Sequence, residues 1–71
     1  MITREALESL ELHTPIVEAL GDGSDLTVVK HKHHWRVYVR RPGVFTAKAR
    51  HEAFSVSGTL LCVRRLRKRF A

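Results

Sequence analysis

The chain has 71 residues, of which 44% are hydrophobic and 28% are charged, and its formal net charge is +6. This length allows one domain with a small core, which folds alone only marginally and is often helped by dimerisation. The hydrophobic content excludes wholesale disorder. No apolar run is long enough to span a membrane, and the acidic N-terminus lacks the apolar core of a signal peptide. We therefore expect one small basic domain, residues 1–71, in the cytoplasm.

The charge is distributed unevenly along the chain. Residues 1–25 contain six carboxylates and one arginine, a net charge of −5, whereas residues 26–71 contain twelve Lys or Arg and one glutamate, a net charge of +11. A positive region of this density attracts phosphate backbones through counterion release, whatever the base sequence. The charge therefore favours a nucleic acid as partner. The alternative is a basic surface kept for solubility or for an acidic protein.

The N-terminal region is typical of helix. Thr3 can cap a helix whose apolar stripe lies within residues 6–10. Pro15 interrupts this helix, and the threonine before it is a good cap for a helix that has proline in its first turn. We therefore predict a second short helix over residues 16–20, ended by the GDGSD sequence at residues 21–25.

Residues 26–40 are rich in β-branched and aromatic side chains and predict strand. One strand of that length would be unusual, so we expect a break or turn near Lys32-His33. With the period of two of a strand, Trp35, Val37 and Val39 face the core. The alternate positions face outward together: His34, Arg36, Tyr38 and Arg40.

A turn is predicted at Arg41-Pro42-Gly43-Val44, because proline suits the first central position and glycine can adopt positive φ at the second. Residues 45–50 then alternate, with Phe45 inward and Lys48 and Arg50 outward, which predicts a third strand that pairs back as a hairpin. A helix is the alternative for this stretch, and periodicity leaves it open. That helix would have Phe45, Ala49 and Ala53 on one face.

The C-terminus predicts a basic helix, with an apolar stripe from Leu60 to Phe70 after a start at Ser57-Gly58. Its many cations suit the negative end of a helix. The single cysteine, Cys62, has no partner for an internal disulfide and is typical of a core residue in a reducing compartment. Together the elements predict an α+β fold, with helices packed on a three-stranded antiparallel sheet.

Basic and aromatic side chains alternate along the outward row, a pattern typical of nucleic-acid-binding surfaces. Guanidinium groups bind phosphate through paired hydrogen bonds, and a tyrosine ring offers a base a surface to stack on. RNA is favoured over DNA, and an ordinary solvated sheet face is the alternative. The predicted nucleic-acid contacts are Lys30, Lys32, Arg36, Tyr38, Arg40, Arg41, Lys48, Arg50, Arg64, Arg65, Arg67 and Lys68.

The KHKHH sequence at residues 30–34 raises the question of catalysis. A metal-independent ribonuclease needs a base for the 2′-hydroxyl proton and cations to stabilise the phosphorane. His34, with Arg36 and Lys32, could supply these groups, although a lone histidine is more often structural. No cofactor is expected, and a metal site is disfavoured because these histidines lie among lysines and lack cysteine or carboxylate partners.

Two further functions are left open by the sequence. Residues 51–70 are similar to a helix-turn-helix, with a Ser-Val-Ser turn before a basic helix that could enter a DNA major groove. The chain would then be a non-enzymatic regulator of phage or plasmid type. Alternatively it binds another protein, as an inhibitor or adaptor, through its acidic N-terminal helix or its basic face. The same acidic helix leaves room for a homodimer.

A family resemblance runs from about residue 15 to residue 67, in PIVEALGDGSDLTVVKHKHHW, RRPG, VFTAKARH and VSGTLLCVRRL. These segments resemble the HicA-type mRNA interferase toxins. The resemblance implies a fold like a double-stranded-RNA-binding domain, metal-independent mRNA cleavage and a cognate antitoxin that masks the site. His34 would match the catalytic histidine of the family, and residues 58–60 would match the start of its last helix. Lys32 and His33 stand where the family has glycine and serine.

Overall fold

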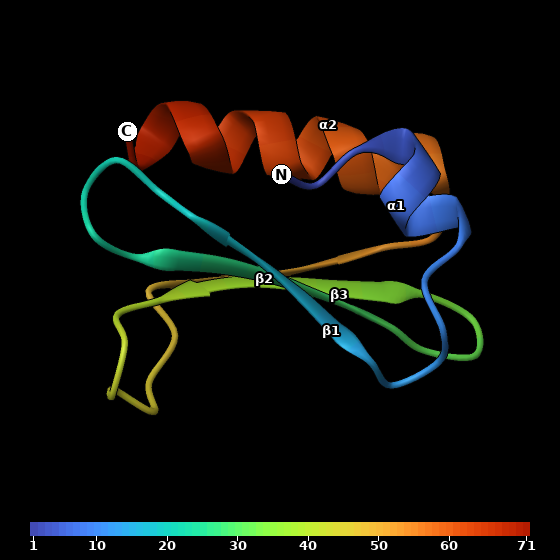
Figure 1. Ribbon diagram of the computed structural model, residues 1–71, viewed down its shortest axis with the longest axis horizontal. Helices are drawn as coiled ribbons and strands as arrows, with labels where there is room; N and C mark the ends of the chain where they lie inside the picture. The colour runs from blue at the N-terminus through green and yellow to red at the C-terminus, as the bar shows by residue number, and fades with distance from the viewer.

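The computed structural model describes residues 1–71, and its strands form one antiparallel sheet in the order β1-β2-β3-β4. Both helices lie on the same side of this sheet, and the other face is uncovered (Figure 1). No helix has both the length and the apolar character needed to cross a bilayer. The α+β fold is confirmed, with four strands rather than three. The elements are α1 (Arg4–Glu8), β1 (Pro15–Ala19), β2 (Asp25–Lys30), β3 (Trp35–Arg40), β4 (Ala49–Ala53) and α2 (Val56–Arg69).

The additional strand is β1, and the short helix predicted over residues 16–20 is wrong. β1 pairs with β2, with Val17 opposite Thr27. Its side chains alternate between exposed and half-buried, which is the period of a strand with one face on a core. Pro15 is tolerated as the first residue of an edge strand, where the missing N–H group need not remove a ladder hydrogen bond. Pairing with β2 therefore overrides the local capping pattern.

The predicted N-terminal helix is confirmed, although α1 has only 5 residues. The Thr3 side chain accepts a hydrogen bond from the backbone N–H of Ala6 at 3.1 Å, and Leu7 is fully buried. The chain leaves the helix at Ser9, so Leu10 packs against the core from outside the helix.

Both turns predicted around β3 are confirmed. The β2–β3 hairpin breaks at Lys32-His33, where the backbone N–H of His31 donates to the carbonyl oxygen of His34 at 2.7 Å. After β3, the N–H of Val44 donates to the carbonyl of Arg41 at 3.1 Å. Gly43 has φ 78°, the left-handed conformation that the second central position of such a turn requires.

The stretch after this turn forms a strand and not a helix, but the strand begins later than predicted. β4 lies in register with β3, with Ala49 opposite Val39 and Ala53 opposite Trp35. Phe45 was expected to face the core and is instead 92% exposed. The turn directs the chain away from the sheet, and pairing resumes only near Lys48, whose N–H donates to Val39 at 2.6 Å.

The core lies between the sheet and α2. Leu26 and Val28 of β2 and Val37 and Val39 of β3 are fully buried, as the alternation predicted for β3. The predicted C-terminal helix is confirmed, and its residue Val63 is fully buried in the same cluster. Ser55, the residue before α2, caps the helix by accepting a hydrogen bond from the N–H of Gly58 at 3.0 Å.

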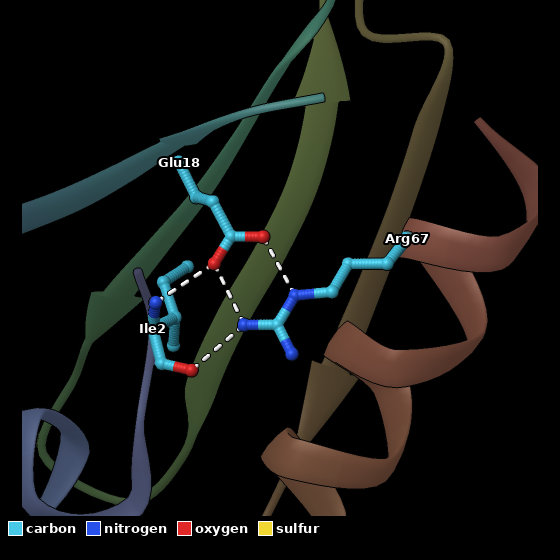
Figure 2. A network of polar contacts seen from close by, with 3 residues as sticks. All are labelled: Ile2, Glu18 and Arg67. Atoms are coloured by element: carbon cyan, nitrogen blue, oxygen red, sulfur yellow. Dashed lines mark hydrogen bonds and ion pairs between the residues drawn. The ribbon is translucent and has the colours of Figure 1, made fainter. Parts of the chain in front are cut away.

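A polar clamp joins the N-terminal segment, β1 and α2 (Figure 2). The guanidinium of Arg67 donates to both carboxylate oxygens of Glu18, at 2.6 and 2.7 Å, and to the carbonyl of Ile2 at 2.8 Å. The N–H of Ile2 in turn donates to Glu18 at 2.8 Å. The hydrogen bonds from Arg67 lower the pKa of Glu18 below its ordinary value, because they stabilise the carboxylate. Glu18 and Arg67 thus hold together three segments that are far apart in the sequence.

Candidate nucleic-acid interface

The face of the sheet that carries no helix holds the row predicted along β3. Because Val37 and Val39 are buried under α2, the alternate residues Arg36, Tyr38 and Arg40 lie on this open face. On the neighbouring strand, Arg50 is directly opposite Tyr38. These four side chains form what we call the basic sheet face.

The arginines of the basic sheet face have few internal partners. The guanidinium of Arg40 lies 5.2 Å from the centre of the Tyr38 ring, a weak and exposed cation–π contact. Arg36 lies 3.9 Å from the carboxylate of Glu52, and both side chains are substantially exposed. Exposed ion pairs of this kind contribute at most about 1 kcal/mol, so a phosphate group can displace Glu52 at little cost.

A hollow of about 310 Å³ lies at one end of this face. Its walls include Arg40, Arg41 and Phe45, with Thr27 of β2 and Val17 of β1. The hollow is at the lower end of the size range of small-ligand sites. It brings two guanidinium groups and an exposed aromatic ring together, which are the groups that bind a nucleotide phosphate and stack on a base.

Histidines gather at the other end of the basic sheet face. The rings of His31 and His34 are stacked with their centres 4.9 Å apart, and the His13 ring packs edge-on against His31 at 5.2 Å. Phe54 lies 6.2 Å from His34. We call His13, His31 and His34 the histidine cluster. No group of three or more His, Cys, Asp or Glu side chains is arranged to hold a metal ion.

Within this cluster His34 and His31 have different environments, which the sequence could not predict. The Nε2 atom of His34, the predicted catalytic residue, is buried and has no hydrogen-bond partner. Desolvation lowers the pKa of His31, and the nearby charges of Arg36, His34 and His13 lower it further. A lowered pKa keeps His31 neutral at neutral pH, which is the state that a general base requires.

Sequence reasoning missed His31 and His13 because their proximity depends on tertiary structure. The N–H of His13 donates to the carbonyl of Lys30 at 2.8 Å, and Leu12 forms a bridge with Lys30. This contact carries the segment before β1 onto the β2–β3 hairpin. Only the density of histidines in the sequence could have indicated the cluster.

The remaining predicted contacts lie elsewhere. Arg67 is occupied by the clamp with Glu18, and the Lys48 ammonium donates to Asp22 at 3.2 Å and to Ser24 at 2.9 Å. Lys30 follows Leu26 and Val28 at every second position of β2, so it lies on the helix-covered side, 5.7 Å from the Trp35 ring centre. We therefore leave these three cations out of the interface. The other predicted contacts outside the basic sheet face are exposed and have no ion-pair partner: Lys32 and Arg41 in the turns and Arg64, Arg65 and Lys68 on α2.

The helix-turn-helix interpretation is wrong. Residues 51–53, where its first helix would have begun, belong to β4 and pair with β3. α2 is thus a helix packed on a sheet, and its exposed cations, which exclude the clamped Arg67, have no preceding helix of such a motif to orient them in a groove.

No protein-family model, curated protein or solved structure matches this chain. The resemblance to HicA-type toxins stays a prediction. It would match the segment that begins PIVEA to the first helix of the family, and these residues form β1 instead. The function of the chain must therefore be inferred from the surfaces that the fold presents.

Proposed function

We propose that the protein binds RNA in single-stranded form on its basic sheet face. The observation that carries the proposal is the uncovered face itself, where Arg36, Tyr38, Arg40 and Arg50 lie on adjacent positions of β3 and β4. Arginines at this spacing can follow a sugar-phosphate backbone while bases stack on an aromatic ring.

A single strand suits this surface better than a duplex does. Sequence recognition in duplex DNA needs a helix or ribbon that enters the major groove, and this face is instead one surface of a four-stranded sheet. Unstacked bases can instead lie flat on the sheet, with Tyr38 as one stacking surface and the exposed Phe45 beside the hollow as another. Tyr38, Arg40 and Phe45 mark the proposed path of the RNA strand along this face.

The test compares two charge-matched double variants. Fluorescence anisotropy with a labelled single-stranded RNA, repeated over a range of salt, gives the affinity and its salt slope. Arg36→Ala with Arg40→Ala should weaken binding at least tenfold and reduce the salt slope by about 1.4, since each phosphate contact contributes about 0.7 for single strands. Arg64→Ala with Arg65→Ala removes the same charge from α2 and should have a clearly smaller effect.

Three results would contradict the proposal. A larger loss from the α2 variant, together with tighter binding of duplex DNA than of RNA, would support a DNA-binding regulator. Binding that is insensitive to salt would exclude phosphate contacts by either face. No binding to any nucleic acid would leave a protein partner, such as an antitoxin or a target of inhibition, as the function of the basic surface.

Stacking can be separated from charge with Tyr38→Leu. This variant keeps an apolar side chain but removes the ring, so the binding free energy should fall by about 1–3 kcal/mol while the salt slope is unchanged. A change in slope would mean that the substitution disturbed Arg40, which contacts the ring.

A second candidate function, metal-independent RNA cleavage, is favoured by the neutral His31 beside Arg36. His31 would take the proton of the 2′-hydroxyl as the 2′-oxygen bonds to phosphorus, Arg36 would stabilise the phosphorane, and the departing 5′-oxygen would take a proton from water. The test is incubation of RNA with chelator. His31→Ala should abolish cleavage under this proposal, whereas the HicA resemblance requires that His34→Ala does so. Intact RNA with the wild-type protein would exclude both.

A further inference from the structure

One edge of the sheet is open to a further strand. β4 is the last strand in the sheet order, so its outer backbone N–H and C=O groups have no strand partner. At the opposite edge, β1 begins with Pro15, a residue that proteins use to block strand addition. β4 has the sequence Ala-Arg-His-Glu-Ala and contains no proline.

A groove of about 390 Å³ runs between β4 and α2. Its lining includes Ala53 of β4 and Leu61 and Cys62 of α2, and Leu61 is 49% exposed although it is a large apolar residue. Burial in the groove raises the pKa of the Cys62 thiol, which keeps it in its apolar form. Strand edge and groove together make a continuous surface that offers both backbone hydrogen bonds and apolar area.

The sequence of β4 complements itself when two copies run antiparallel. With a two-fold axis at His51, Ala49 lies opposite Ala53 of the second copy, and Arg50 lies opposite Glu52 of the second copy. Symmetry produces each pair twice. Opposite charges directly across two antiparallel strands contribute about 0.2–1 kcal/mol for each pair relative to alanine.

The charges also select this register over its neighbours. Centring the axis on Arg50 would place the two copies of Arg50 opposite each other, and centring it on Glu52 would do the same to the glutamates. A one-residue slip would place α2 of the second copy on the other face of the sheet, because successive side chains of a strand point to opposite faces. Within the five residues of β4, only the axis at His51 pairs opposite charges without pairing like ones, and it keeps both α2 helices beside the groove.

We propose that β4 pairs antiparallel with β4 of a second copy of this chain about a two-fold axis at His51, which joins the two sheets into one. Backbone hydrogen bonds form between the two strands, and two Arg50–Glu52 pairs form on the open face. On the helix-covered side, the second copy covers Leu61 in the groove. Arg65, Arg69 and His51 of both copies approach the axis and oppose association, but all three are exposed, so their side chains can extend into solvent. The basic sheet faces of the two copies become contiguous.

Reversal of the two charges tests the register. Light scattering and sedimentation equilibrium, without nucleic acid, should show that the wild-type chain dimerises as its concentration rises. Arg50→Glu and Glu52→Arg alone each create two like-charge pairs and should weaken the dimer at least tenfold. The double variant restores opposite charges across the axis and should recover the wild-type dissociation constant. Circular dichroism melts would confirm that each variant is folded.

A disulfide provides a second, independent measurement. In a Cys62→Ser background, His51→Cys places two thiols directly opposite each other, at a Cβ separation of about 4.5–5.5 Å, and mild oxidation should yield a covalent dimer. Val17→Cys in the same background puts an exposed thiol on β1, at the far edge, and should stay largely monomeric.

A wild-type chain that remains monomeric at about millimolar concentration overturns the proposal and leaves this edge to a strand of another protein. Equal oxidation of the two cysteine variants, or a double charge reversal that does not recover the dimer, overturns it as well. None of these readouts involves RNA, so failure here is separate from failure of the proposed function.

Discussion

The two faces of the sheet are made by alternate residues of the same strands, yet they differ in burial and in charge. Towards α2, Val37 and Val39 are fully buried. On the open face, Arg36, Tyr38 and Arg40 alternate with these valines in the sequence and are half-exposed. A fold that needs only one apolar face leaves the other free for charge, because solvated side chains there contribute little to stability. The helix-covered face should therefore determine stability, and the open face should determine binding.

The largest loss of stability is expected from the helix-covered face. Leu26→Ala removes a fully buried side chain of β2 and should lower the free energy of unfolding by about 2–5 kcal/mol. This is a large part of the stability of a chain of this size. Val17→Ala, on the open face and 55% exposed in the wild type, should cost less than about 1 kcal/mol. Urea denaturation measures both, and equal losses would contradict the division between the faces.

The second-largest loss of stability is expected from the clamp, because its hydrogen bonds tie α2 and the N-terminal segment to β1. Arg67→Met removes the donor for Glu18 and Ile2 and should cost on the order of 2 kcal/mol, since charge-assisted hydrogen bonds to a largely buried carboxylate are lost. Glu11→Gln, which changes an exposed residue outside the helices and strands, should leave stability within about 0.5 kcal/mol.

The clamp also predicts how stability depends on pH. The pKa of Glu18 is lower in the folded protein than its ordinary value of 4.5, so the native state favours the carboxylate. The stabilisation is therefore fully present above pH 4.5 and is lost as pH falls through the lower, folded pKa. Arg67→Met should flatten the stability profile below pH 4.5. A wild-type profile with the same acid slope as the variant would show that the clamp is not formed in solution.

Much of the fold could be predicted from local sequence, and the failure at β1 shows the limit. The alternation of residues 35–40, the turn at Pro42-Gly43 and the stripe of α2 are local signals, and each was confirmed. The sequence PIVEA also carries local signals, and these favour helix. What makes it a strand is the exposed edge of β2, with which it pairs through residues 25–29, and capping patterns contain no information about that edge.

The candidate site shows the same limit for side chains. Alternation placed Arg36, Tyr38 and Arg40 on one face without any tertiary information. Charge composition, however, could not distinguish a free arginine from a paired one. Arg67 meets Glu18 across 49 residues of sequence, and only the packing of α2 over β1 reveals the pair. The histidine cluster escaped prediction for the same reason, because His13 joins it through a long-range backbone contact.

A smaller loss of stability is expected from substitutions at Gly43, in the turn beside the open face. Gly43 has φ 78°, and a Cβ atom at this position would meet nothing within 4 Å, so substitution causes strain without a clash. Gly43→Ala should cost about 1 kcal/mol. Gly43→Asn should cost less, because asparagine tolerates this conformation better than alanine does. Thermal unfolding of the pair would detect the difference, and a larger loss for asparagine would mean that packing rather than φ controls the position.

The smallest effect on stability, and the one that separates the two faces most sharply, is expected from Arg40→Gln. This variant removes an exposed cation–π contact with Tyr38 and should change the free energy of unfolding by less than about 1 kcal/mol. If the open face is the RNA interface, the same change should remove a phosphate contact and weaken RNA binding several-fold, with a reduced salt slope. A variant that lost stability but kept its RNA affinity would show that the row along β3 stabilises the fold and does not bind RNA. Binding lost at constant stability is the result that only a functional surface produces.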